Sequence, residues 1–249
     1  MTPAIIAIGG GSMAEGATLS IDREIVKMAG RKRASALFIP TASSDNPEYS
    51  ENFSKVYGKQ LGCHTSSLLL FKNPPPLSEI RKQIQAADII YVGGGNTLMM
   101  MRRWRFLGVD KVLMKACQEG KVLAGSSAGA ICWFQYGHSD SEFYYHPEQW
   151  DWIRVKCLGI LPFTACPHCL KEGRMEHFIR MIKKQGGTGI ALDDCTAIQI
   201  AGNRYRILRS KQGAQAFHVS KSDDKVITAS FPVSDSFQSI DKLKQSISP

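Results

Sequence analysis

The stretch Val122-Leu123-Ala124-Gly125-Ser126-Ser127-Ala128-Gly129-Ala130 indicates the fold most clearly in this 249-residue sequence. Its first three residues form a short apolar run typical of a buried strand, and a helix-like segment, Ala130–Phe134, follows the turn. The G-x-S-x-G pattern between them places Ser127 on a sharp bend from strand to helix, where the hydroxyl is exposed. Because the flanking glycines leave room for close backbone approach, Ser127 is a candidate nucleophile.

Strand-like and helix-like runs alternate around this turn through the first three-quarters of the chain. The alternation predicts parallel βαβ units with helices on both faces of a sheet. The expected strands are Ala4–Ile8, Ala36–Pro40, Ser67–Phe71, Asp88–Val92, Val122–Gly125 and Gly159–Phe163. The expected helices are Leu19–Ala29, Glu48–Leu61, Ser78–Ala86, Leu98–Phe106, Val109–Glu119 and Leu170–Lys184. The sequence thus predicts an α/β fold built on a doubly wound, mostly parallel sheet.

From about residue 188 the alternation of strand-like and helix-like runs ends, and short β-rich segments separated by turn residues follow. These pieces are Ile190–Leu192, Ala197–Ala201, Tyr205–Leu208, Ala216–Val219 and Val226–Ala229. We expect them to form a meander that extends the edge of the sheet. Since no repeat or linker interrupts the pattern, residues 1–249 are predicted to form a single α/β domain.

Composition and charge exclude several classes of protein. Hydrophobic residues make up 43% and charged residues 21% of the chain, which excludes fibrous and disordered proteins. No apolar run approaches the roughly 18 residues of a membrane span, and no signal peptide is recognisable, so a cytoplasmic protein is expected. The net charge of +9 is spread over small basic groups at predicted helix ends. We therefore expect no nucleic-acid or membrane partner, and a monomer or homodimer.

Two further glycine-rich turns follow predicted strands. Gly93-Gly94-Gly95-Asn96-Thr97 opens a helix, so its backbone amides suit an anion or a developing oxyanion. Gly9-Gly10-Gly11-Ser12-Met13-Ala14 matches a dinucleotide fingerprint, but the second strand ends in Pro40-Thr41-Ala42-Ser43 without the ribose-binding acid. We therefore expect no nucleotide cofactor.

A serine nucleophile needs a base and an acid that orients the base. His168 follows a predicted strand and precedes a helix, so it shares the carboxyl edge of the sheet with Ser127. His138, just after the nucleophile helix, is the second candidate base. Sequence spacing does not decide the acid, for which the candidates are Asp140, Glu142, Asp193 and Asp194.

Cys166-Pro167-His168-Cys169 also has a redox interpretation, because a C-x-x-C at the start of a helix is typical of thiol-disulfide oxidoreductases. Such proteins carry this motif after their first core strand, whereas here it lies late in the chain. A zinc site with Cys195 is a further alternative, but no second C-x-x-C accompanies it, and no metal is expected. The seven scattered cysteines are expected to be reduced.

Taken together, the motifs resemble the dipeptidase E and cyanophycinase family of serine peptidases. The residues that carry the resemblance are Gly93-Gly94-Gly95-Asn96-Thr97, Gly125-Ser126-Ser127-Ala128-Gly129-Ala130 and Pro167-His168 followed by Arg174. The resemblance runs from about residue 5 to residue 200. It implies a fold similar to class I glutamine amidotransferases (flavodoxin-like), in which the nucleophile elbow carries serine in place of cysteine.

The resemblance assigns roles to single residues. It implies that Ser127 is the nucleophile, His168 its base and Asp140 the orienting acid, with Glu142 and Asp194 as alternatives. The amides of Gly95 and Ala128 would form the oxyanion hole. Arg174 would pair with a substrate carboxylate, for which a planar bidentate donor is well suited, and Asn96 would also bind substrate.

The implied activity is hydrolysis of small acidic peptides with an N-terminal aspartate, through an acyl-enzyme and without a cofactor. A cyanophycinase-like hydrolase of β-aspartyl peptides is the alternative within the family. From other classes, a thiol-disulfide oxidoreductase and a non-catalytic binding protein of the same fold remain open.

Overall fold

The computed structural model describes residues 3–222, 225–232, 234 and 236–244 of the chain. Its strands are β1 (Ala4–Ile8), β2 (Ser35–Ile39), β3 (His64–Ser67), β4 (Ile89–Val92), β5 (Val122–Ser126), β6 (Phe134–Ser139), β7 (Ile153–Lys156), β8 (Leu161–Pro167), β9 (Thr188–Leu192), β10 (Thr196–Ala201), β11 (Arg204–Arg209), β12 (Ala216–Ser222), β13 (Lys225–Ser230) and β14 (Gln238–Ser239). Its α-helices are α1 (Leu19–Met28), α2 (Pro47–Phe53), α3 (Leu77–Ala86), α4 (Thr97–Leu107), α5 (Val109–Gln118), α6 (Ala128–Ile131), α7 (Arg174–Gln185) and α8 (Asp241–Lys244). A π-helical segment, Ser54–Gln60, continues α2, and short 3-10 turns cover Thr41–Ser43 and Ser141–Tyr144.

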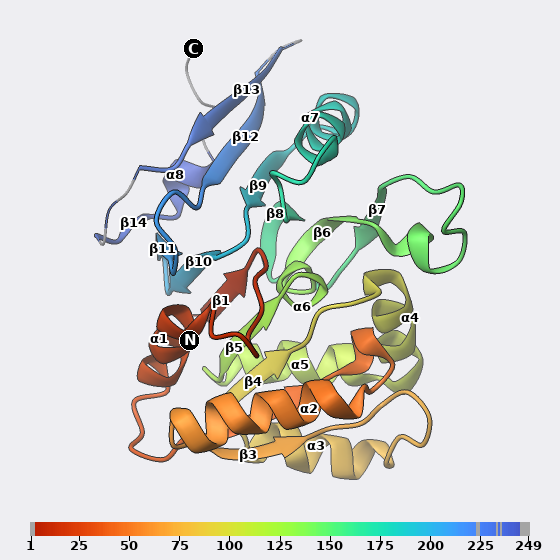
Figure 1. Cartoon of the computed structure of the whole chain (residues 1–249), viewed down its shortest axis with the longest axis vertical. Helices are drawn as coiled ribbons and strands as arrows, with labels where there is room; N and C mark the ends of the chain where they lie inside the picture. The colour runs from red at the N-terminus through yellow and green to blue at the C-terminus, as the bar shows by residue number, and fades with distance from the viewer. Residues whose placement is uncertain (1–2, 223–224, 233, 235, 245–249) are drawn as a thin grey trace.

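The strands form two sheets in a mixed α/β arrangement (Figure 1). The eight-stranded sheet has the order β14-β11-β10-β1-β5-β4-β2-β3, and its strands β1, β5, β4, β2 and β3 are parallel neighbours. The six-stranded sheet has the order β13-β12-β9-β8-β6-β7, with β6, β8 and β9 parallel. The predicted α/β class is confirmed, but the described residues form two mixed sheets where the sequence predicts one.

Alternating side chains of the eight-stranded sheet pack against helices on both of its faces. Along β1, Ile5 and Ala7 join a buried cluster with α3, α4 and α5, whereas Ile6 and Ile8 join a second cluster with α1 and the π-helical segment. Fully buried strands of this kind read as continuous apolar runs, because both faces are covered. This explains why the core parallel strands were visible in the sequence.

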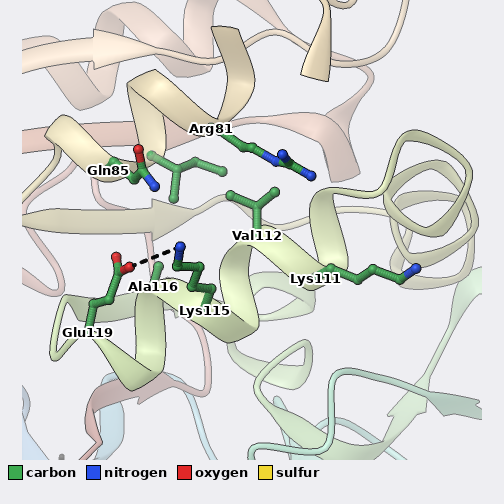
Figure 2. Close-up of a pocket in the computed structure, with 8 residues that line it drawn as sticks. Arg81, Gln85, Lys111, Val112, Lys115, Ala116 and Glu119 are labelled. Atoms are coloured by element: carbon green, nitrogen blue, oxygen red, sulfur yellow. Dashed lines mark ion pairs between the residues drawn. The ribbon is translucent and has the colours of Figure 1, made fainter. Parts of the chain in front are cut away.

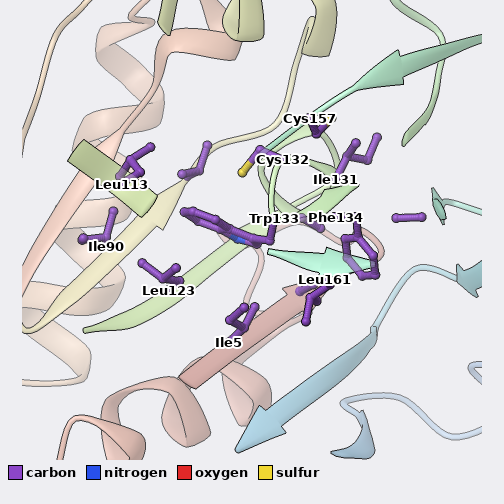
Figure 3. Close-up of a cluster of buried hydrophobic side chains, with 14 of the residues drawn as sticks. Ile5, Ile90, Leu113, Leu123, Ile131, Cys132, Trp133, Phe134, Cys157 and Leu161 are labelled. Atoms are coloured by element: carbon purple, nitrogen blue, oxygen red, sulfur yellow. The ribbon is translucent and has the colours of Figure 1, made fainter. Parts of the chain in front are cut away.

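The second sheet shares the first cluster and is covered by α7 on its other face. Figure 3 shows Ile5 of β1 in one apolar cluster with Trp133, Phe134 of β6 and Leu161 of β8. Phe178 of α7 packs with buried residues of β8, β9 and β12. A continuous apolar cluster therefore joins the two sheets, and the extent of the single domain stays a prediction.

The C-terminal pieces do more than extend one sheet edge. β10 pairs antiparallel with β1, placing Ala201 opposite Ala4, and β11 follows it. In contrast, β9, β12 and β13 complete the second sheet. β6 and β7 were not expected, because the sequence predicts a helix-like segment at Ala130–Phe134 and no strand between it and Gly159.

The strand expected at Ser67–Phe71 is displaced to His64–Ser67. The apolar residues after Ser67 form a loop in which Asp45 accepts a hydrogen bond from the Phe71 amide at 2.5 Å. Arg103 donates to the carbonyl oxygens of Leu70 and Phe71 at 2.7 and 2.8 Å. Side-chain hydrogen bonds thus replace the strand ladder, and a local apolar pattern does not distinguish the two.

The buried carboxyl of Asp22 in α1 predicts an unusual pH dependence of stability. Burial raises its pKa to about 6, although Thr18 and Tyr57 each donate a hydrogen bond to it at 2.8 Å. Because the folded-state pKa lies above the ordinary 3.8, stability should fall as pH rises from about 4 to 6 and then level off. We expect Asp22→Asn to stabilise the protein by about 2 kcal/mol at pH 8 and hardly at all at pH 4.

Urea denaturation at both pH values measures this difference. A loss of stability of equal size at pH 4 and pH 8 would instead show that the ionised carboxylate is well accommodated. None of the helices in the described part of the chain is long and apolar enough to cross a bilayer.

Candidate active site

The candidate site lies where the carboxyl ends of strands from both sheets meet. Three turns follow neighbouring strands of the first sheet: Gly9–Gly11 after β1, Gly93–Gly95 after β4, and Ser127 after β5. His168 and Asp194 follow β8 and β9 of the second sheet. Such strand ends are the usual place for ligands in α/β folds.

Backbone strain is concentrated at this site. Ser127 has φ 54° and ψ −114° on the bend between β5 and α6, a conformation unfavourable for a residue with a side chain. His168 and Cys195, the neighbour of Asp194, also have positive φ, at 49° and 62°. Strained non-glycine residues persist where the surrounding structure fixes them, often at functional sites.

Ser127, His168 and Asp194 form a continuous hydrogen-bonded chain. The Ser127 Oγ lies 2.9 Å from His168 Nε2, and His168 Nδ1 lies 2.5 Å from Asp194 Oδ1. The hydrogen bond with His168 is the main cause that holds the pKa of Asp194 below its usual value, so this carboxyl is ionised at neutral pH. The arrangement can remove a proton from the hydroxyl and stabilise the resulting imidazolium.

The first glycine turn connects the segments that carry His168 and Asp194. The His168 amide donates to the Gly9 carbonyl at 3.3 Å, and the Cys195 amide donates to the Gly10 carbonyl at 3.0 Å. A Cβ atom at Gly10 would clash with the Asp194 carboxyl and the His168 ring. Close packing against His168 and Asp194 therefore accounts for glycine at this position, and the dinucleotide motif is not needed to explain it.

Two backbone amides in the turns next to Ser127 have no acceptor in the described structure. The Gly95 amide has no acceptor among the described residues, and the Ala128 amide is the first of α6, so it has no intrahelical partner. The other amides of residues 93–96 are bonded, from Gly93 to Ile39 O at 3.2 Å, Gly94 to the Tyr49 hydroxyl at 3.2 Å and Asn96 to Ala42 O at 2.8 Å. The two free amides are suited to hold an oxyanion.

A sequence profile of peptidase family S51 matches residues 5–208. The chain belongs to peptidase family S51. Over 92% of its length, this S51 chain is 35% identical to "Uncharacterized peptidase YgaJ" of Bacillus subtilis (strain 168), of which 97% is covered. It is also 25% identical to a "Probable alpha-aspartyl dipeptidase" of Drosophila melanogaster, over 73% of this chain and 75% of that one.

Solved structures show the same fold. A putative peptidase E protein from Listeria monocytogenes EGD-e superposes with a TM-score of 0.63 at 20% identity, covering 84% of the S51 chain and 99% of its own. A peptidase from an acI-B1 Actinobacterium superposes with a TM-score of 0.67 at 16% identity, covering 93% and 98%.

The acid beside His168 differs from the prediction for this S51 chain. Asp140 was predicted to orient His168, but its carboxylate pairs with Arg174 at 3.2 Å. Asp194, one of the alternatives, takes the position beside His168. Glu142, the other alternative, is bonded elsewhere: it accepts a hydrogen bond from the Asp151 amide at 3.3 Å. The order of residues along the chain does not show which carboxylate lies beside His168, because loops from different strands converge in space.

Arg174 and Asn96, predicted to bind substrate, both have hydrogen-bond partners within the protein. Arg174 is only 2% exposed and donates to Asp140 and, at 3.1 Å, to the carbonyl oxygen of His138. The Asn96 side chain is buried and caps α4 by accepting from the Met99 amide at 3.0 Å. Both side chains therefore stabilise the loops around the site in this structure.

His138 and the two cysteines of the C-x-x-C motif have environments that disfavour their alternative roles. His138 is fully buried, is bonded to His177 Nδ1 at 2.9 Å, and has a pKa lowered by burial to about 2. Cys166 and Cys169 are fully buried free thiols, and burial raises the pKa of both, that of Cys166 to about 12. A redox thiol requires the opposite, an accessible and readily ionised sulfur.

No group of three or more His, Cys, Asp or Glu side chains in the described part of the S51 chain could hold a metal ion. A pocket of about 470 Å³ adjoins the candidate oxyanion amide, because Gly95 and Asn96 line it together with Phe71, Tyr144 and Tyr145. A different pocket, shown in Figure 2, lies between α3 and α5, and its eight lining residues include none of the site.

Proposed function

We propose that this S51 peptidase is a serine-type dipeptidase with Ser127, His168 and Asp194 as its catalytic triad. The observation that carries the proposal is the unbroken path from Ser127 Oγ through both nitrogens of His168 to Asp194, at 2.9 and 2.5 Å. The strained turn at Ser127 and the two free amides beside it support the same assignment.

The proposed reaction is acyl transfer to water. His168 Nε2 accepts the Ser127 proton while Oγ attacks the peptide carbonyl, and the imidazolium then donates that proton to the leaving amine. The Gly95 and Ala128 amides hold the oxyanion, an effect of about 3 kcal/mol per donor. A water molecule, deprotonated by the same nitrogen, hydrolyses the acyl-enzyme.

Asp194 determines which nitrogen of His168 accepts the proton. Because the ionised carboxylate can only accept, the Nδ1 atom must carry hydrogen, which leaves Nε2 free to take the hydroxyl proton. The carboxyl is partly exposed, at 48%, so its charge is partly screened by water. We assign it a positioning and electrostatic role.

We further propose that the substrates are small peptides with an N-terminal aspartate. The name of the Drosophila relative, a probable alpha-aspartyl dipeptidase, supports this specificity. Lys171 and Arg174 also support it, since their positive charges act on Asp194 and thus extend to the site. The Arg174 guanidinium is buried, so it does not pair directly with the substrate as the sequence predicted. Instead, the electrostatic field of Arg174 and the exposed Lys171 attract the substrate carboxylate.

Hydrolysis of Asp-Leu, Glu-Leu, Ala-Leu and β-aspartyl-Leu by the purified protein tests this specificity. We expect kcat/KM for Asp-Leu to exceed that for Ala-Leu by about fivefold, because the attraction of a substrate carboxylate by an exposed lysine contributes about 1 kcal/mol. Equal rates for Asp-Leu and Ala-Leu would contradict the aspartyl specificity while leaving the triad intact. A preference for the β-linked peptide would favour the cyanophycinase-like alternative. We also propose that the fold is related to that of class I glutamine amidotransferases.

A further inference from the structure

In the turn Gly93–Asn96, every backbone amide except that of Gly95 has a hydrogen-bond acceptor among the described residues. Two of its three acceptors, Ile39 O and Ala42 O, belong to the backbone. The third is the side-chain hydroxyl of Tyr49, which accepts from the Gly94 amide at 3.2 Å. We propose that Tyr49 is a positioning residue of the candidate oxyanion hole, an inference that rests on the proposed function.

The Tyr49 ring is itself held firmly in place. Its amide donates to the side chain of Asn46, the cap of α2, at 3.0 Å. Its ring packs edge-on against Phe38 at 4.9 Å, and Phe38 stacks on Phe53 at 4.7 Å. Burial raises the pKa of Tyr49, which keeps the hydroxyl in its neutral form. The Tyr49 side chain therefore gives the Gly94 amide an acceptor at a fixed position.

The turn is shaped to receive this ring. A Cβ atom at Gly93 would lie only 2.9 Å from Tyr49 Cε1, closer than side chains approach one another. Glycine at this position lets the ring approach the backbone directly, which places its hydroxyl under the Gly94 amide. The sequence motif and the tyrosine thus depend on each other, although Tyr49 lies outside every motif that the sequence displays.

Gly94 transmits the position of Tyr49 to the reacting groups. A Cβ atom at Gly94 would lie 3.4 Å from Ser127 Cβ, so Gly94 lies directly beside the nucleophile elbow. The Gly94 carbonyl and the Gly95 amide belong to one planar peptide unit. A rotation at Gly94 therefore changes the direction of the Gly95 N–H, and an oxyanion donor must lie within about 2.7–3.1 Å of the developing charge.

Tyr49→Phe removes the acceptor oxygen and keeps the ring packing. The Gly94 amide then lacks its partner, and the turn can relax toward other acceptors. We expect the loss of alignment to slow chemistry at Ser127 about tenfold, less than the loss of a whole oxyanion donor. The effect should fall on kcat, with KM for Asp-Leu changed less than twofold, because Tyr49 positions a group that acts in the transition state.

The rate of Ser127 labelling by a small fluorophosphonate tests the inference without knowledge of the substrate. In this reaction Ser127 Oγ bonds to phosphorus, fluoride leaves, and the hydroxyl proton passes to His168, while the phosphoryl oxygen occupies the oxyanion hole. Tyr57→Phe is the matched control, because Tyr57 belongs to the same aromatic cluster but bonds to Asp22 and not to the turn. We expect slower labelling in Tyr49→Phe, about tenfold, and a change below twofold in Tyr57→Phe.

The outcomes separate this inference from the proposed function. Equal labelling rates in the wild type and a folded Tyr49→Phe variant would overturn the role of Tyr49 alone, and so would a loss confined to KM. No labelling of the wild type would overturn the proposed function and this inference with it. Should Tyr49→Phe not fold, Asn46→Ala frees the amide of Tyr49 and should slow labelling about threefold; an unchanged rate there would also count against the inference.

Discussion

Ser127→Ala is expected to lower kcat/KM for Asp-Leu by about 10⁵- to 10⁶-fold, to a rate that only binding and the oxyanion amides sustain. The reason is that alanine has no atom that can form the acyl-enzyme, and His168 alone cannot replace it. Steady-state hydrolysis by the variant and the wild type, purified and assayed in the same way, measures the loss.

The substitution should leave the fold intact, because the strained turn is fixed by its surroundings. Two neighbouring helix amides, those of Ala130 and Ile131, donate to the Ser127 carbonyl at 3.0 Å, and the Ser127 amide donates to Ile8 O at 3.0 Å. These backbone bonds survive the change of side chain. Activity of the folded variant above about 1% of wild type would remove Ser127 from the role of nucleophile.

Asp194→Asn is expected to lower kcat by about 10³- to 10⁴-fold with a small change in KM. An amide group can donate to His168 Nδ1, which moves the histidine hydrogen to Nε2, where it can no longer accept the Ser127 proton. The negative charge that stabilises the imidazolium is also lost. Initial rates over a range of substrate concentrations separate kcat from KM.

Asp140→Asn is the matched control for this substitution. Its carboxylate pairs with buried Arg174, so the change should weaken that contact and lower the stability by about 1–2 kcal/mol, with kcat reduced less than fivefold. If instead Asp140→Asn lost 10³-fold in kcat while Asp194→Asn stayed active, the acid would be Asp140 after all.

The sequence predicted those parts of the molecule that depend on local pattern. The apolar run of β5 and the G-x-S-x-G bend placed Ser127 correctly, and strand ends placed His168 at the same edge, 2.9 Å from Ser127 Oγ. Both features follow from rules that act over a few residues, namely buried strands and the turn between strand and helix.

The carboxylate that lies beside His168 could not be predicted, because its position depends on pairing between distant strands. β9 carries Asp194 into place only once it pairs with β8, whereas Asp140 lies nearer to Ser127 along the chain but points to Arg174. A signal was present in Gly10, since the clash of a Cβ atom there with Asp194 and His168 explains the first glycine turn. From sequence alone the same turn resembled a dinucleotide motif.

The second sheet and the role of Tyr49 were inaccessible for a related reason. β6 contains polar residues and Gly137, so its pattern does not indicate a buried strand, and the pairing with β8 provides the missing information. Tyr49 lies on a predicted helix with no motif around it, and its contact with Gly94 is a tertiary one.

Mapping the fluorophosphonate adduct by peptide mass spectrometry tests the central claim most directly. The account predicts one modified residue, Ser127, with labelling suppressed by excess Asp-Leu and abolished in the folded Asp194→Asn variant over the time that labels the wild type completely. Modification of Cys166 or another residue, or no labelling of folded wild-type protein, would contradict the assignment of Ser127, His168 and Asp194 as a catalytic triad.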